Sequence, residues 1–79
     1  MKHDAILKNA SPYPFNENKA IGYIFGDTKG RFDDGEHIVT SVIIEHIRDC
    51  HGVSTHIVTK SGTVYKLVYG DMQDNNDVI

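Results

Sequence analysis

Short runs of β-branched and aromatic residues, separated by glycine-containing turns, dominate the chain from residue 20 to residue 69. In the first run, Ala20–Phe25, bulky and smaller side chains alternate, as in a strand that turns one face to a core. Gly26 and Gly30 then interrupt the pattern. The triplet Asp-Asp-Gly at residues 33–35 is a strong turn signal, because Asp and Gly tolerate left-handed backbone conformations. This pattern predicts strands joined by a long charged loop and by tight turns.

Residues 41–50 form the ambiguous element. The segment is rich in isoleucine and valine, whose branched side chains favour strands over helices. Ser41, however, is a residue type that caps helices, and Gly52 is one that ends them. A strand is the favoured interpretation. The alternative is an α+β fold in which a helix at about 41–50 packs on the sheet.

Two further strands are expected at residues 53–60 and 63–69, where β-branched and aromatic residues again dominate. Ser61-Gly62 lies between them and is a candidate two-residue hairpin turn. A turn centred there pairs Val58 with Tyr65 on one face of the hairpin.

Together these elements predict a mainly β protein, a small antiparallel SH3-like barrel or meander of four to five strands. The single β domain is expected to span residues 20–69. Residues 1–19 lack a sustained period and contain Pro12 and Pro14, so an extended or flexible N-terminal arm is expected. Residues 70–79 are polar and acidic, which predicts a disordered tail.

Size and composition narrow the setting. A chain of 79 residues allows one domain with a marginal core. Cys50 is the only cysteine, which excludes an internal disulfide and is typical of a reducing compartment. No leader-like segment and no apolar run near the roughly 20 residues of a membrane span is present, so we expect a cytoplasmic protein outside the membrane. The net charge of −3 argues against nucleic acid as a partner.

None of the motifs that carry chemistry is convincing. Gly26–Arg31 lacks the spacing of a phosphate-binding loop, and no helix is expected after it. The aspartates of the long loop lack the pattern of a calcium loop. Cys50 and His51 are adjacent in sequence, so they cannot readily face one another as nucleophile and base. We therefore expect no catalytic residues, no metal, no cofactor and no enzymatic activity.

A protein-binding surface is the remaining candidate. Arginine and aromatic residues are enriched at binding hot spots, and the long loop carries an adjacent pair of them. The predicted partner-binding residues are Lys29, Arg31, Phe32, Asp33 and Asp34 of the loop, with Tyr13 and Phe15 of the arm. In the alternative interpretation, Phe32 turns inward to plug the loop and Arg31 pairs with Asp33 or Asp34.

The run Gly-Asp-Thr-Lys-Gly-Arg-Phe at residues 26–32 is followed by Asp-Gly at 34–35 and Thr-Ser at 40–41. With the closing segment at residues 58–67, it resembles a pattern found in short open reading frames of bacteriophages and prophages. The resemblance implies a small accessory protein that acts in the host bacterial cytoplasm by binding a host protein. Some phage proteins of this kind disable bacterial defences.

We therefore expect a non-enzymatic, phage-type accessory protein that binds a bacterial host protein or complex. Inhibition of a defence system such as a CRISPR effector is the most specific form of this hypothesis. One alternative is a small nucleic-acid-binding accessory module. Another is a self-associating structural protein, and both a monomer and a homodimer remain open.

Overall fold

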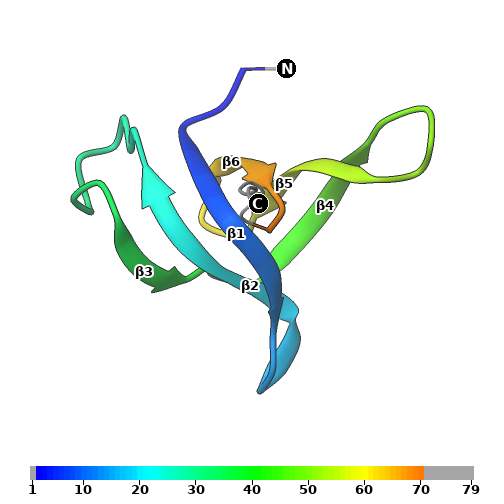
Figure 1. The fold of residues 1–79 in the computed structure, drawn as a ribbon, viewed down its shortest axis with the longest axis horizontal. Helices are drawn as coiled ribbons and strands as arrows, with labels where there is room; N and C mark the ends of the chain where they lie inside the picture. The colour runs from blue at the N-terminus through cyan, green and yellow to red at the C-terminus, as the bar shows by residue number, and fades with distance from the viewer. Residues whose placement is uncertain (1, 71–79) are drawn as a thin grey trace, which may run out of the picture.

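Six strands form one mixed sheet in this computed structural model, which describes residues 2–70. They are β1 (Ala5–Tyr13), β2 (Asn16–Phe25), β3 (Glu36–Val39), β4 (Ile43–Arg48), β5 (Ser54–Thr59) and β6 (Val64–Val68). Their order across the sheet is β3-β2-β1-β6-β5-β4 (Figure 1). Neighbouring strands are antiparallel except β1 and β6, which run parallel. The expected β class is confirmed, and residues 2–70 contain no helix.

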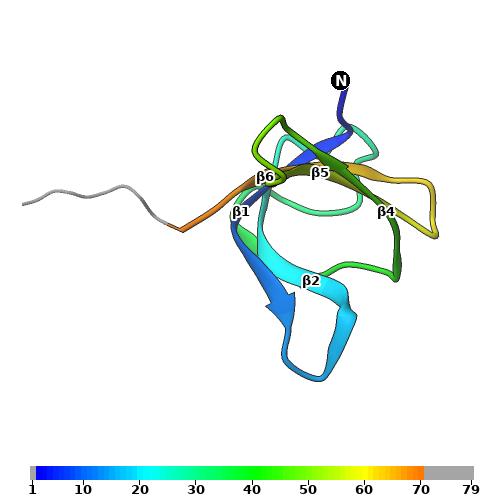
Figure 2. The same cartoon turned by 90° about the vertical axis from the view of Figure 1, so that its right-hand side faces the viewer.

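The sheet curls around its core without closing into a barrel (Figures 1 and 2). β4 approaches β2 across the concave side, but β3 and β4 each keep one unpaired edge within the sheet. The buried apolar side chains are Ala5, Leu7, Ala10, Ala20, Ile24, Ile38, Ile57 and Tyr65. They line the concave face, so the core lies inside the curl.

The predicted N-terminal arm is wrong. Residues 5–13 form β1, which lies inside the sheet between β2 and β6, and Leu7 is fully buried. Asn9 adopts the left-handed φ of 56°, and the pairing with β2 shifts register between Lys8 and Ser11. Leu7 and Ala10 are therefore both buried although they lie three residues apart. This bulge removes the period of two by which a strand is recognised in a sequence.

The predicted number of strands and the predicted barrel are also wrong. Because residues 5–13 add a strand, the sheet has six strands rather than four or five, and its parallel β1–β6 pair makes it mixed. The helix considered for residues 41–50 is wrong, since Ile43–Arg48 is the edge strand β4.

The predicted acidic tail, apart from Gly70, lies outside the described residues. The described residues include no helix long and apolar enough to cross a bilayer.

The β5–β6 hairpin has a three-residue loop rather than a two-residue one. The Gly62 amide donates to the Thr59 carbonyl over 2.8 Å, and the Thr59 amide donates to the Thr63 carbonyl over 3.0 Å. Gly62 supplies the positive φ of 86° that this loop requires. The register therefore differs by one residue from the expected one, and Tyr65 pairs with Ile57 rather than Val58. This shift puts Tyr65 in the core.

Candidate functional site

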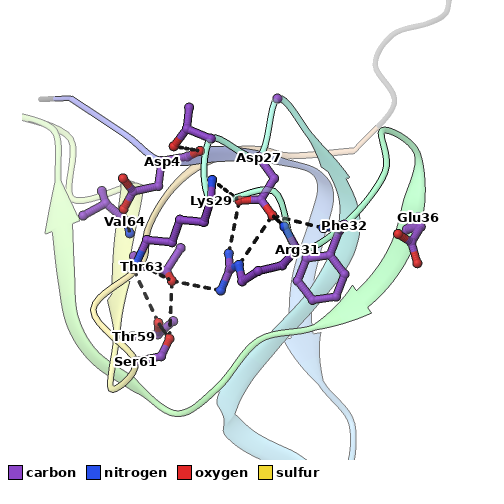
Figure 3. Close-up of polar contacts among 12 residues, drawn as sticks. Asp4, Asp27, Lys29, Arg31, Phe32, Glu36, Thr59, Ser61, Thr63 and Val64 are labelled. Carbon is purple, nitrogen blue, oxygen red and sulfur yellow. Dashed lines mark hydrogen bonds and ion pairs between the residues drawn. The ribbon is translucent and has the colours of Figure 1, made fainter.

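The candidate site is the loop of residues 26–35 between β2 and β3, and the Asp27 carboxylate organises it (Figure 3). This carboxylate accepts backbone hydrogen bonds from the amides of Lys29 at 3.1 Å, Arg31 at 2.9 Å and Phe32 at 3.2 Å. Aspartate side chains bind amides a few residues ahead in this way and so hold turns in place. The side chain of Asp27 is only 1% exposed. The loop is therefore built around one buried carboxylate.

Arg31 closes the same arrangement with its side chain. Its Nη2 lies 3.3 Å from Oδ1 of Asp27 and its Nε lies 3.4 Å from Oδ2. Its Nη1 donates to the hydroxyl of Thr63 on the β5–β6 hairpin at 3.2 Å. The Arg31 side chain stays 34% exposed, so it stabilises the loop and also forms part of its surface.

Lys29 reaches the same hydroxyl from the other side. Its Nζ donates to Thr63 Oγ1 over 3.4 Å. Thr63 itself is fully buried, and its hydroxyl also lies 3.3 Å from that of Ser61, which is 3.0 Å from that of Thr59 (Figure 3). Two cationic side chains thus converge on a chain of hydroxyls that joins the loop to β5 and β6.

The charges of this cluster are mutually stabilised. Burial works against the charged form of Asp27, but the hydrogen bonds from Arg31 and from the Lys29 amide outweigh it and hold the pKa of Asp27 below its usual value. Burial likewise opposes the charge on Arg31. The hydrogen bonds with Asp27 and the neighbouring Tyr65 hydroxyl nevertheless raise the pKa of Arg31. Both groups are ionised at neutral pH.

The second half of the loop is fixed by acidic residues and by β2. The Gly26 amide donates to Asp34 Oδ1 at 2.7 Å, and the Asp33 amide donates to Glu36 Oε2 at 2.6 Å. The Gly35 amide donates to a carbonyl of β2 at 2.7 Å. Asp33 and Asp34 are exposed at the residue level, so the loop presents two aspartates beside the two cations.

The alternative interpretation of the loop is right for one residue and wrong for the other. Phe32 is half-buried and packs against the core, so it does plug the loop. Arg31, whose guanidinium carbon lies 5.3 Å from the Phe32 ring centroid, pairs with Asp27 rather than with Asp33 or Asp34. Phe32 is therefore mainly a packing residue.

The structure does not bring Tyr13 and Phe15 to the loop. Both lie at the β1–β2 turn, with their ring centroids 5.4 Å apart in a T-shaped arrangement. The loop follows the opposite end of β2, a strand of ten residues. That separation is about 30 Å for an extended strand. The predicted site therefore divides into two separate surfaces.

Two residues that organise the loop were not among the predicted ones. Asp27 carried a usable signal, because an aspartate followed within a few residues by glycine is typical of a side-chain-closed turn. Thr63 carried none, since it lies more than thirty positions along the chain from the loop that it contacts.

The described part of the chain holds no cluster of three His, Cys, Asp or Glu side chains suited to a metal ion. No family model, curated protein or solved structure matches the chain. The functional argument rests on the geometry of the loop and of its neighbouring strand.

Proposed function

We propose that the protein is a non-enzymatic, phage-type accessory protein that binds a bacterial host protein in the cytoplasm. A component of a defence system, such as a CRISPR effector, is the target class that we propose. The binding surface consists of the loop at residues 26–35 and the free edge of β3. The observation that carries the proposal is the preordering of this loop by Asp27, which leaves Lys29, Arg31 and Asp33 as exposed residues.

Preordering matters because a binding loop that is already fixed loses little conformational entropy when it meets a partner. Lys29, Arg31, Asp33 and Asp34 give the surface charges of both signs within a short segment. Such a pattern selects a partner by electrostatic complementarity and rejects partners with like charges opposite its own. No reactive group is needed for a function of this kind.

β3 adds a second element of recognition. Among residues 2–70 it pairs only with β2, and the Thr40 amide after it donates to the Ala20 carbonyl at 2.8 Å. Backbone groups alternate in an antiparallel ladder, so those of His37 and Val39 point to the free edge. An extended segment of a partner fits there by strand addition. Tyr23, 42% exposed and 4.9 Å from His37 between ring centroids, lies beside that edge.

The test begins with affinity capture from bacterial lysate and continues with variants against the recovered partner. Val39→Pro removes the amide at the free edge without removing a bond to β2, and Val39→Thr keeps that amide as the matched control. Lys29→Glu combined with Asp33→Lys reverses two surface charges of the loop.

We expect the partner to bind the wild type and Val39→Thr but to be lost from Val39→Pro and from the charge-reversed variant. Capture of no stoichiometric protein by the wild type would overturn the proposal. Unchanged binding by both disruptive variants would overturn the assignment to the loop and β3.

A second candidate function is nucleic-acid binding, which one observation favours. The β registers align His37, Tyr23 and Lys8 in one row across the convex face, and the Lys8 ammonium lies 4.5 Å from the Phe25 ring centroid. Aromatic and basic side chains interleave in this way on sheets that bind single strands. A gel-shift assay at low salt tests this candidate, and absence of a shift with single-stranded and duplex DNA and RNA removes it.

A further inference from the structure

The β1–β2 hairpin projects from the body of the protein (Figure 2). Phe15 lies in the turn at its tip. Phe15 is 85% exposed, the highest value among the large hydrophobic residues of the described chain. Its ring lies edge-on to that of Tyr13. Single exposed apolar residues are common, but an aromatic pair at the tip of a projecting hairpin forms an apolar knob, which residues 2–70 leave uncovered.

A groove lies at the base of the same hairpin, on the concave side of the sheet. Its volume is about 220 Å³. The apolar residues that line it are Ala10, Pro12, Ala20, Ile43, Ile57 and Leu67. Glu17, Lys19 and His46 are among the polar lining residues. The groove is smaller than the roughly 300–1,000 Å³ of sites for drug-sized ligands, so it fits a side chain better than such a ligand.

The knob and the groove cannot meet within one molecule. Phe15 does not line the groove and is largely exposed, whereas Pro12 and Lys19 on the two strands of the hairpin do line it. The tip is three to four residues from these positions, or about 10 Å along extended strands. Within one molecule the knob and the groove therefore stay apart.

We propose that the protein forms a two-fold symmetric dimer in which Phe15 of each copy fills the groove of the other. Two hairpins that lie antiparallel about a two-fold axis place each tip beside the base of its neighbour. The same surface is then used on both copies, as closed dimers require. Neither groove is complete without the residue supplied by the other copy.

The charges on the hairpin are compatible with this arrangement. Glu17 and Lys19 lie two residues apart along β2, line the same groove, and form no ion pair with each other among the described contacts. In an antiparallel pair of hairpins, Glu17 of one copy lies beside Lys19 of the other. The surface is thus self-complementary in charge as well as in shape.

The proposal is independent of the function proposed above, because the loop at residues 26–35 lies at the other end of β2. Dimerisation through the hairpins leaves both loops free. A dimer would present two identical binding loops to a host protein, which strengthens binding to a multivalent target.

Sedimentation velocity over a range of protein concentrations tests the proposal. We expect the wild type to shift from monomer to dimer as concentration rises and to stop there. Phe15→Ala, which removes two exposed rings per dimer, is expected to raise the dissociation constant by about a hundredfold or more. Val53→Ala, at a 47% exposed apolar residue outside the groove, is the matched control and should dimerise as the wild type does.

Exchanging the charges of Glu17 and Lys19 provides a second test. Lys19→Glu alone makes both hairpins acidic and is expected to weaken the dimer, whereas Lys19→Glu combined with Glu17→Lys restores opposite charges and should recover it. A wild type that stays monomeric up to about 1 mM, an assembly that grows beyond two copies, or a Phe15→Ala protein that dimerises normally would each overturn the proposal. Capture of a host protein by a monomeric wild type through Phe15 would assign the knob to that partner and would also overturn it.

Discussion

Gly22 of β2 and Leu7 of β1 are packed so closely that no side chain fits between them. A Cβ atom built on Gly22 would lie 2.7 Å from Leu7 Cγ and 2.8 Å from the Lys8 carbonyl oxygen. Leu7 is fully buried and occupies the space above the glycine. The pairing of β1 with β2 therefore depends on a residue without a side chain at this position.

Gly22→Ala is expected to lower the free energy of unfolding by about 1–3 kcal/mol, because the added methyl group forces Leu7 and the β1 backbone to move. Urea denaturation followed by circular dichroism measures this change. In a Leu7→Ala background the same substitution should cost less, although the contact with the Lys8 carbonyl limits the relief. Equal costs in the two backgrounds would show that Leu7 is not the obstacle.

Asp27→Ala is expected to release the loop at residues 26–35 and to lower the free energy of unfolding by about 1–2 kcal/mol, because three backbone amides lose their acceptor. Hydrogen exchange at Lys29, Arg31 and Phe32 should accelerate. Asp33→Ala is the control, since the loop binds its amide rather than its carboxylate. Unchanged exchange in Asp27→Ala would contradict the central role of this carboxylate.

The charge on Asp27 should also make stability depend on acid pH. Its folded pKa lies below the ordinary value of 3.8, so the unfolded chain takes up the proton first as pH falls. The stabilisation is complete above about pH 4 and is lost as pH falls through the lowered folded pKa. The difference in unfolding free energy between wild type and Asp27→Asn should therefore shrink below about pH 4. A difference that stays constant down to pH 2 would contradict this assignment.

Phe32 and Phe15 form a matched pair of aromatic residues with different surroundings. Phe32→Ala should lower the free energy of unfolding by about 1–3 kcal/mol, somewhat less than truncation of a fully buried ring, because Phe32 is only half-buried against the core. Phe15→Ala should change the stability of the monomer by less than about 0.5 kcal/mol. Denaturation at a concentration where the protein is monomeric separates the two. Equal effects would show that Phe32 does not plug the loop.

His56 should produce a second pH dependence, in the neutral range. Burial, followed by nearby positive charges that include His3 and Lys66, lowers the pKa of His56 below its ordinary value of 6.5. The unfolded chain then binds more protons than the folded one, so stability should fall as pH drops below about 6.5. His56→Gln should reduce this slope, whereas His51→Gln, at an exposed turn, serves as the control. An identical slope in His56→Gln would rule out the proposed linkage.

Much of the architecture follows from local sequence patterns. The alternating side chains of Ala20–Phe25 predicted the inner half of β2, and the branched residues of 43–48 favoured the strand that β4 forms. β1 was not predicted, because its bulge at Asn9 breaks the alternation of side chains and the two prolines that follow suggest a loose segment. The register of the β5–β6 hairpin was predicted wrongly, because its turn, which contains Gly62, is one residue longer than expected.

For the loop at residues 26–35 as well, local features could be predicted from the sequence and the long-range contact could not. Its position and its glycines were visible in the sequence, and the hydrogen bonds of Asp27 are local enough to have been expected. Its attachment to Thr63 depends on β1 and β6 lying side by side, which brings the β5–β6 hairpin under the loop. That parallel pairing joins strands from opposite ends of the described chain and leaves no local signal.

The parallel pairing of β1 with β6 also determines when the sheet can be completed during translation. Ala5–Lys8 pairs with Tyr65–Val68, so β1 meets its second neighbour only after β6 has been made. Until then one edge of β1 is bare, and the apolar side chains of Ala5 and Leu7 lack part of their cover. β1, β2 and β3 can pair in the order in which they are made, but β4 and β5 join the same sheet only through β6. A message truncated before the codons for β6 therefore yields a polypeptide without a finished core.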